Sequence, residues 1–135
     1  MTASPAPLRI AIGENNSDLA SALATLIDLQ PDLRCVGHAA TTQGVLALAA
    51  REKPDSYVLD LTLDDGSAIA LIRTLRATQP GCAIIAFTGL GDPGLAEQCR
   101  DAGCDATLQK DGQVRPLLDT LRRLRPAGPA LPCPA

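Results

Sequence analysis

The sequence predicts an α/β fold in which a doubly wound parallel sheet is covered by helices on both faces. Short apolar runs alternate with segments of helical periodicity five times along the 135 residues, a length that suits one domain with a buried core. Strands that alternate with helices are joined by right-handed crossovers and therefore lie parallel. The chain has one Phe, one Tyr and no Trp, so the core must be built from Leu, Ile, Val and Ala.

The first two strand–helix pairs are expected within the first 54 residues. The first strand is Leu8–Ile12, and the helix after it shows a single apolar face. This face is formed by Leu19, Leu23, Leu26 and Ile27. The second strand, Arg34–Gly37, precedes a helix at Thr42–Glu52 that is filled mostly by Ala and Leu. Lys53-Pro54 ends this helix, because a residue before proline avoids the helical conformation.

The third and fourth pairs follow the same pattern. The third strand, Ser56–Leu59, precedes a helix that ends at Gln79-Pro80-Gly81. The apolar face of this helix is formed by Ala68, Leu71, Ile72 and Leu75. The fourth strand is Cys82–Phe87, and its cysteine is expected to belong to the core. Asp92-Pro93 is typical of an N-cap followed by proline in the first turn, and Gly103 is typical of the end of that helix.

The fifth pair completes the expected fold. The strand Ala106–Gln109 is followed by the last helix. The apolar face of that helix is formed by Val114, Leu117, Leu118 and Leu121. The domain is expected to span residues 8–125. Residues 126–135 hold four prolines and no periodicity, so they and residues 1–7 are expected to be disordered.

Composition narrows the class of protein. The formal net charge of −3 argues against nucleic acid as the main partner. The basic run Leu121–Pro126 is the exception; it suits the negative end of a helix better than a phosphate site, and the second interpretation stays open. Five cysteines without a C-x-x-C pair, and no recognisable signal peptide, predict free thiols in the cytoplasm. His38 has no ligand partners nearby in sequence, and no segment resembles a membrane span.

Polar residues follow four of the five expected strands. Glu14 and Asn15 follow the first strand, Asp60 follows the third, Thr88 the fourth and Lys110 the fifth. The carboxyl ends of parallel strands share one edge of the sheet, and ligands bind at that edge. The second strand ends in Gly-His-Ala with nothing obviously reactive, which fits a strand at the margin of the sheet. We therefore expect these five residues to form one site.

The residue types of this site suit phosphoryl transfer to a carboxylate. Carboxylate and amide oxygens are ligands for a hard cation such as Mg²⁺, which keeps several of its waters. A hydroxyl and an ammonium group nearby suit the oxygens of a phosphoryl group. A turn at the strand end is the ordinary explanation for "GENN", but four polar strand ends on one edge favour a site.

Four motifs in this order resemble one known family. "IAIGENNSDLASAL" is similar to its first strand, where two adjacent acids are usual, and "PDSYVLDLTLDDGSAIALIRTLR" to its third strand and phosphoacceptor aspartate. "AIIAFTG" is similar to its fourth strand with a hydroxyl residue, and "AGCDATLQKDG" to its fifth strand with a lysine. The stretch from Leu8 to Leu124 thus resembles the receiver domain of bacterial two-component response regulators.

The resemblance implies both a topology and roles for the site residues. The topology is a flavodoxin-like (βα)5 sandwich with sheet order 2-1-3-4-5. Asp60 would accept a phosphoryl group from a histidine kinase or phosphotransfer protein, Thr88 would donate a hydrogen bond to it, and Lys110 would pair with it. Mg²⁺ would be held by Glu14, Asn15, Asp60 and the backbone carbonyl of Thr62, with Glu14 acting through water. Such a module catalyses its own phosphorylation and is a signalling protein rather than an enzyme.

The resemblance also implies how the signal leaves the domain. Output would pass through protein contacts on the fourth helix, the fifth strand and the fifth helix. The sequence contains no segment that resembles a DNA-binding output domain, and a homodimer stays open.

Four positions depart from the family pattern. Asn15 replaces an acid, which predicts weaker Mg²⁺ binding, and Thr107 replaces the usual Tyr or Phe of the conformational switch. Asp64 and Asp111 stand where proline is common. These departures keep open the alternative of a degenerate receiver that binds partners without phosphorylation.

A nucleotide-binding enzyme is a remote second alternative. Gly89–Gly94 matches G-x-G-x-x-G, follows a strand and precedes a helix, with Asp111 about twenty residues further on. However, this motif normally lies in the first βαβ unit, and too few residues remain after Gly94 to complete such a fold.

Overall fold

The computed structural model describes residues 6–63, 67–89 and 93–125, and it confirms the predicted fold class and strand order. The first half of the chain forms β1 (Leu8–Gly13), α1 (Ser17–Asp28), β2 (Leu33–Ala39), α2 (Thr42–Glu52) and β3 (Ser56–Leu59). The second half forms α3 (Ala68–Thr78), β4 (Ala83–Thr88), α4 (Pro93–Ala102), β5 (Ala106–Gln109) and α5 (Arg115–Arg123). All neighbouring strands are parallel in the order β2-β1-β3-β4-β5.

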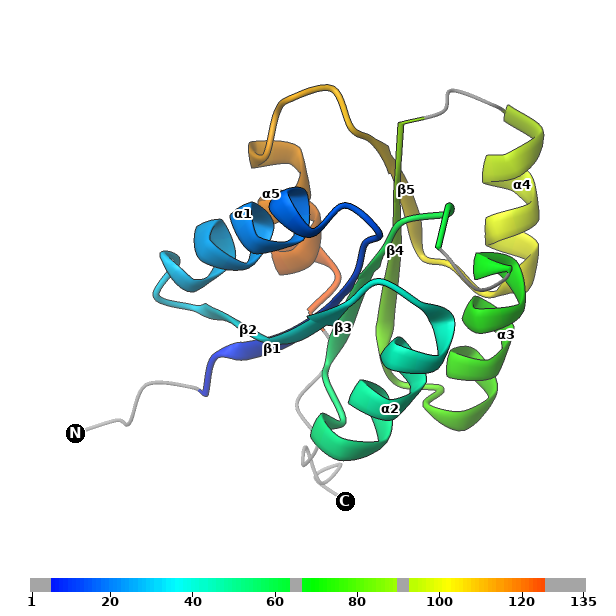
Figure 1. Ribbon diagram of the computed structural model, residues 1–135, viewed down its shortest axis with the longest axis horizontal. Coiled ribbons are helices and arrows are strands. Elements are labelled where there is room, and N and C mark those ends of the chain that lie inside the picture. Colours follow the sequence, from blue (N-terminus) through cyan, green and yellow to red (C-terminus); the bar gives the residue numbers. More distant parts are fainter. Residues whose placement is uncertain (1–5, 64–66, 90–92, 126–135) are drawn as a thin grey trace, which may run out of the picture.

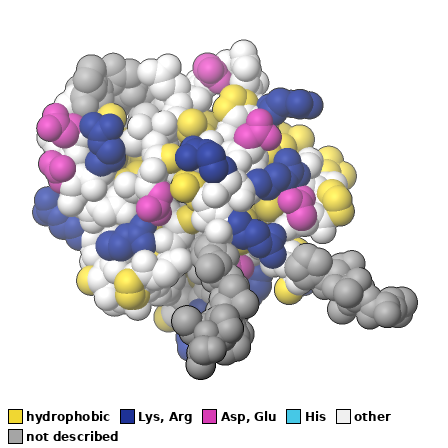
Figure 2. Space-filling model, turned by 180° about the vertical axis from the view of Figure 1, so that it is seen from behind, with side chains coloured by type: hydrophobic (Ala, Val, Ile, Leu, Met, Phe, Trp, Pro, Cys, Tyr) yellow, Lys and Arg dark blue, Asp and Glu magenta, His cyan; other side chains and the backbone are white. Residues whose placement is uncertain are grey.

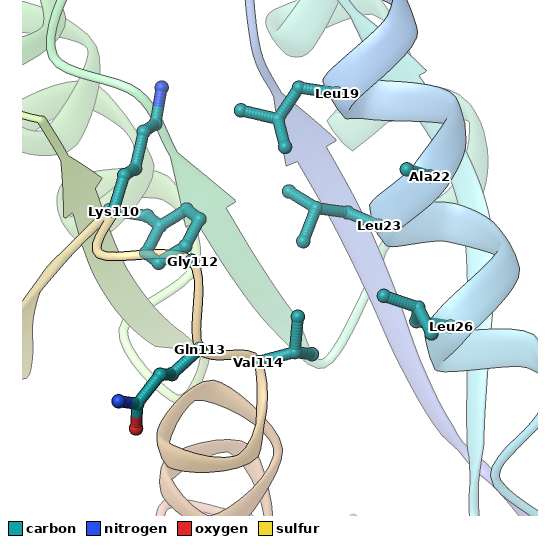
Figure 3. A pocket seen from close by; sticks show the side chains of 9 residues that line it. Leu19, Ala22, Leu23, Leu26, Lys110, Gly112, Gln113 and Val114 are labelled. Carbon is teal, nitrogen blue, oxygen red and sulfur yellow. The ribbon is translucent and has the colours of Figure 1, made fainter.

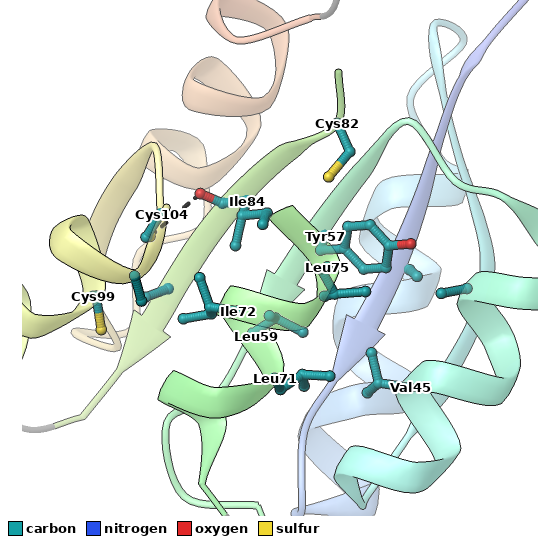
Figure 4. Packing of buried hydrophobic residues seen from close by; sticks show 14 of the residues in the cluster. Val45, Tyr57, Leu59, Leu71, Ile72, Leu75, Cys82, Ile84, Cys99 and Cys104 are labelled. Carbon is teal, nitrogen blue, oxygen red and sulfur yellow. Dashed lines mark hydrogen bonds between the residues drawn. The ribbon is translucent and has the colours of Figure 1, made fainter. Parts of the chain in front are cut away.

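Helices cover both faces of the sheet, as Figure 1 shows. Helices α1 and α5 lie on one face, where they pack on Ile10, Ile12, Val58 and Ile85. Helices α2, α3 and α4 lie on the other. The core on that second face is drawn in Figure 4, and its central members are Val45, Tyr57, Leu59, Leu71, Ile72, Leu75 and Ile84. Aliphatic side chains therefore fill both layers, as the near absence of aromatics predicts.

The strands and helices begin and end close to their predicted residues. Strand β2 is longer than predicted and runs from Leu33 to Ala39, while β4 begins at Ala83, one residue after the expected start. The cysteine at position 82 is nevertheless part of the core, together with Cys99 and Cys104. Burial raises the pKa of the Cys99 thiol to about 11, which leaves it unreactive.

Polar contacts join the C-terminal end of the described chain to its first 32 residues. The guanidinium of Arg122 contacts both carboxylate oxygens of Asp32, at 2.8 and 3.0 Å, and lowers the pKa of that carboxyl group. Arg125 donates to the carbonyl oxygen of Ala6 at 2.7 Å. The basic run Leu121–Pro126 therefore contacts the turn between α1 and β2 through Arg122. Figure 2 shows that Lys and Arg side chains are interspersed with Asp and Glu over the rear face.

Gly13, the last residue of β1, brings this strand close to its neighbours. A methyl group there would lie 2.9 Å from Cγ2 of Val45 and 3.0 Å from Cδ2 of Leu59. Both contacts are too short, so Gly13→Ala is expected to lower the free energy of unfolding by about 1–2 kcal/mol in urea titrations. Gly81→Ala is the control, since nothing lies within 4 Å of its added methyl group. Equal stability of the two variants would show that the core yields at Gly13 without cost.

Candidate functional site

The structure brings all the predicted site residues to one open cavity at the carboxyl edge of the sheet. The cavity has a volume of ≈ 420 Å³. It is lined by Glu14, Asn15, Asn16, Leu19, Asp60, Thr62, Thr88, Gly89 and Lys110. Strand β2 contributes nothing to this lining, as its unreactive end predicts. The prediction that these strand ends meet is therefore confirmed, while the roles of the residues stay predictions.

Backbone hydrogen bonds hold the site residues at their places just beyond the strands. The amide of Asp60 donates to the carbonyl of Gly13 at 2.7 Å, and the amide of Lys110 donates to the carbonyl of Thr88 at 2.8 Å. The amide of Glu14 donates to the carbonyl of Ala39 at 2.9 Å. The sheet ladder thus continues one residue past the strand ends, which fixes the backbone under each functional side chain.

Lys110 bridges two buried carboxylates. Its Nζ lies 2.5 Å from Oε1 of Glu14 and 3.1 Å from Oδ2 of Asp60. The side chains of Glu14 and Asp60 are only 2% and 3% exposed. Buried carboxylates are costly unless they are paired, so the single ammonium group compensates both. The Lys110 Nζ also lies 6.0 Å from the centre of the Phe87 ring, which lines the adjoining apolar groove.

The second oxygen of each carboxylate is held by the chain itself. The amide of Asn16 donates to Oε2 of Glu14 at 3.0 Å. The amide and the hydroxyl of Thr62 both donate to Oδ1 of Asp60, at 3.1 and 3.0 Å. Sequence reasoning assigned only a backbone carbonyl to Thr62 and missed its side chain. The contact could have been suspected from the sequence, because a hydroxyl residue stands two positions after the candidate phosphoacceptor.

The two carboxyl groups have pKa values shifted in opposite directions. Burial raises the pKa of Glu14 and, with a smaller contribution from the nearby Asp60, outweighs the opposing effects of Lys110 and the Asn16 amide. Burial acts on Asp60 in the same direction, but the Thr62 amide, Glu14 and Lys110 together outweigh it and lower the pKa of Asp60. Burial thus disfavours the ionised form of Glu14, whereas the Thr62 amide and Lys110 favour the ionised form of Asp60.

The remaining site residues differ in how far they are exposed to solvent. Asn15 is exposed at the rim. Asn16 is the N-cap of α1, and its side chain accepts from the amide of Leu19 at 3.1 Å, so one of the two amides in "GENN" has the structural role of a helix cap. Thr88 ends β4 with 8% exposure and lies on the cavity wall.

The residue types of the cavity are compatible with a magnesium ion. Glu14 and Asp60 carry carboxylates, and Asn15 and Thr62, which also line the cavity, carry neutral oxygens. Within the described part of the chain, no group of three or more His, Cys, Asp or Glu residues could hold a metal. Mg²⁺ is commonly bound through one or two carboxylates with several retained waters, which this set can provide. Lys110 contacts the same carboxylates and would compete with the cation.

An apolar groove adjoins the cavity and shares Leu19 and Lys110 with it. Its volume is ≈ 210 Å³. Figure 3 shows Leu19, Leu23 and Leu26 of α1 facing the segment that leads from β5 to α5, at Gly112 and Val114. The aliphatic part of the Lys110 side chain therefore lies beside an apolar surface while its ammonium group reaches the carboxylates.

Several predictions fall wholly or partly outside the described residues. Asp64 and the predicted N-cap Asp92 lie there, and so do residues 90–92 of the glycine motif Gly89–Gly94. The predicted disorder of the two termini also concerns residues outside the described part, at 1–5 and 126–135. No helix among the described residues is long and apolar enough to cross a membrane.

Comparison with known proteins identifies the family. The family model of the response regulator receiver domain matches residues 10–122. Two similar proteins are the transcriptional regulatory proteins YvfU and DesR of Bacillus subtilis. YvfU is 29% identical over an alignment that covers 86% of this chain, and DesR is 28% identical over 85%. The chain spans a little over half the length of these two relatives, at 58% and 57%.

Solved structures agree on the fold. The response regulator domain of Thermotoga maritima CheB superposes with a TM-score of 0.82 at 22% identity, over 91% of this chain and 99% of that one. A LuxR-family DNA-binding response regulator from Staphylococcus aureus gives 0.82 at 19% identity, over 87% and 98%. With the family model matched over most of its length, the chain belongs to the response regulator receiver domain family.

Proposed function

We propose that Asp60 accepts a phosphoryl group from a histidine kinase or a phosphotransfer protein, with Mg²⁺ bound beside it. The observation that carries this proposal is a buried aspartate, held 3.1 Å from a lysine ammonium, in a cavity that opens to solvent. The site would work in the cytoplasm, where such a donor transfers its phosphoryl group to a soluble receiver.

The residues divide the transfer step among them. An oxygen of the Asp60 carboxylate attacks phosphorus, the bond from phosphorus to the donor nitrogen breaks, and its electron pair stays on that nitrogen. Lys110 would neutralise charge on the phosphoryl oxygens once its contact with the two carboxylates loosens, and Thr88, which lines the same cavity, would donate a hydrogen bond. Bound Mg²⁺ would add further neutralisation of phosphoryl charge, held by Glu14, Asn15, Asp60 and the Thr62 carbonyl.

The test is phosphorylation by acetyl phosphate with Mg²⁺, read by intact mass. We expect one phosphoryl adduct on the wild-type chain and none on Asp60→Asn. Asp111→Asn is the matched control, because it removes an exposed carboxylate from the same edge of the sheet. If Asp60→Asn still carries a phosphoryl adduct, or if Asp111→Asn carries none, Asp60 is not the acceptor.

A second candidate function is that of a receiver that binds its partner without being phosphorylated. Asn15 at the rim and the half-buried Thr107 on β5, in place of an acid and an aromatic residue, favour it. Absence of any adduct on a folded wild-type chain would support this alternative. In either case we propose that the output surface is α4, β5 and α5, and that it contacts a protein.

A further inference from the structure

The apolar groove beside the cavity of Asp60 is large enough to hold an organic group. Its volume is ≈ 210 Å³, and an apolar cavity of about 150 Å³ can hold a molecule the size of benzene. Leu23 and Leu26 of α1 line one side and Val114 lines the other, as Figure 3 shows. Gly112 leaves this space open, because a Cβ added there would meet no heavy atom within 4 Å apart from its chain neighbours.

The groove and the cavity lie on the same face of the sheet. Asp60 and Lys110 stand two residues after Val58 and Leu108, and side chains two residues apart along a strand point to the same face. Val58 and Leu108 belong to the core beneath α1 and α5, and so does Leu23 of the groove. A ligand that reaches Asp60 from this face can therefore extend into the groove.

The two spaces differ in charge. Among the described residues that line the groove, Lys110 is the only one with a charged side chain. Lys110 and Leu19 line both spaces, and the Lys110 ammonium group lies 3.1 Å from Oδ2 of Asp60. A ligand that spans both spaces would thus be complementary if it carries an anionic group beside Lys110 and a neutral apolar group in the groove.

We propose that the groove binds the acyl chain of a small phosphodonor, an acyl phosphate with a longer chain than acetyl phosphate; this inference rests on the proposed function. In the transfer an oxygen of the Asp60 carboxylate bonds to phosphorus, and the bond from phosphorus to the acyl oxygen breaks. The electron pair of that bond leaves with the carboxylate of the released fatty acid. No proton has to move, so the chain-binding groove needs no acid or base, in agreement with its apolar lining.

The expected preference follows from the apolar area that the chain would bury. Butyryl phosphate has two methylene groups more than acetyl phosphate, the same charge and a leaving carboxylate of nearly the same basicity. Binding that is equal in the ground and transition states raises the second-order rate constant at donor concentrations far below saturation. A fully buried methylene group strengthens binding roughly fourfold, so we expect this constant to be roughly three- to fifteenfold higher for butyryl phosphate.

The experiment measures the rate of adduct formation by intact mass with each donor and Mg²⁺. Ala22 is exposed and lines the groove, so Ala22→Leu takes up space in the groove without entering the core. Ser21 is exposed on the same helix and does not line the groove, so Ser21→Leu is the matched control. We expect the ratio of the two rate constants to fall close to one in Ala22→Leu and to stay at the wild-type value in Ser21→Leu.

A binding measurement on the wild type checks the location of the chain without any variant. Butyl phosphonate carries the same kind of anionic group and chain but cannot transfer its phosphoryl group. In the presence of Mg²⁺ it should shift the methyl NMR signals of Leu23 and Val114 more than methyl phosphonate does. Equal shifts with the two phosphonates would overturn the inference.

The outcomes separate this inference from the proposed function. Equal rate constants for the two donors on the wild type overturn the inference and leave Asp60 as the acceptor, with the groove free for a side chain of a protein partner. A preference for butyryl phosphate that remains in a folded Ala22→Leu, as checked by melting curves, also overturns it, because the chain then binds elsewhere. No adduct from either donor on the folded wild type overturns both the inference and the proposed function.

Discussion

Replacing Arg76 with alanine is expected to lower the free energy of unfolding by about 3 kcal/mol. Arg76 is half-buried near the end of α3, and its guanidinium donates to three backbone carbonyls on two loops. It donates to Gly103 from Nε and Nη2 at 3.0 and 2.8 Å, and to Pro80 and Cys82 from Nη1 at 2.9 and 2.7 Å. It also pairs with Asp105 at 2.7 Å. One side chain thus holds the α3–β4 and α4–β5 loops together.

The size of the effect follows from what the truncation leaves behind. The carbonyls of Cys82 and Gly103 would lose a charged donor where the surrounding structure limits access of water. Asp105, which also accepts from the amide of Ile84 at 2.8 Å, would lose its counter-charge. These losses share one side chain and do not add, so we set the total near the strength of one or two charged hydrogen bonds.

Arg73 is the matched control on the same helix. It is exposed, and no hydrogen bond or ion pair to it is found among the described residues, so Arg73→Ala should change stability by less than about 0.5 kcal/mol. Arg76→Lys keeps the charge without the fork and should recover only part of the loss. Urea titrations measure all three variants. Equal midpoints for Arg73→Ala and Arg76→Ala would show that water replaces the guanidinium at no cost.

The fold was predictable because its signals are local. Pro54, Pro80 and Gly103 mark helix ends through their own backbone preferences, and the apolar faces repeat within a few residues. The extra length of β2 was not predictable in this way. Leu33 joins the strand because it pairs with Leu8 on β1, a contact that its own sequence context does not contain.

The site was predictable in its location but not in its contacts. Parallel strands must bring Glu14, Asp60 and Lys110 to one edge, so their meeting followed from topology. Which groups pair was not determined, because the contact of Lys110 with Glu14 joins residues 96 apart and depends on side-chain rotamers. The hydroxyl contact of Thr62 to Asp60 depends in the same way on the turn that follows β3.

Asn15→Asp is expected to tighten Mg²⁺ binding by about tenfold to several hundredfold. The variant adds a third carboxylate to a cavity that now has two. At about 4 Å, one charge contributes roughly 4 kcal/mol per unit of cation charge at an effective dielectric near 20, and roughly 1 kcal/mol in bulk water. Asn15 is exposed, so the true value lies between these limits, and desolvation of the new carboxylate offsets part of it.

The same substitution should destabilise the metal-free protein. Lys110 is already the single ammonium group that contacts both Glu14 and Asp60 in this site. A third carboxylate beside them therefore adds like-charge repulsion that this lysine does not compensate. Asn15→Asp should therefore melt at a lower temperature in EDTA than the wild type and show a larger rise when Mg²⁺ is added. Thermal melts at graded Mg²⁺ concentrations measure both effects.

Asn16→Asp is the control that separates position from charge. It adds the same charge one residue further on in the same cavity, but that side chain caps α1 by accepting from the amide of Leu19, so its charge is used at the start of the helix. We expect a slightly higher melting temperature and little change in the response to Mg²⁺. If Asn15→Asp melts at the same temperature with and without Mg²⁺, position 15 does not face a metal site. "GENN" would then be a turn and a helix cap in which only Glu14 belongs to the site.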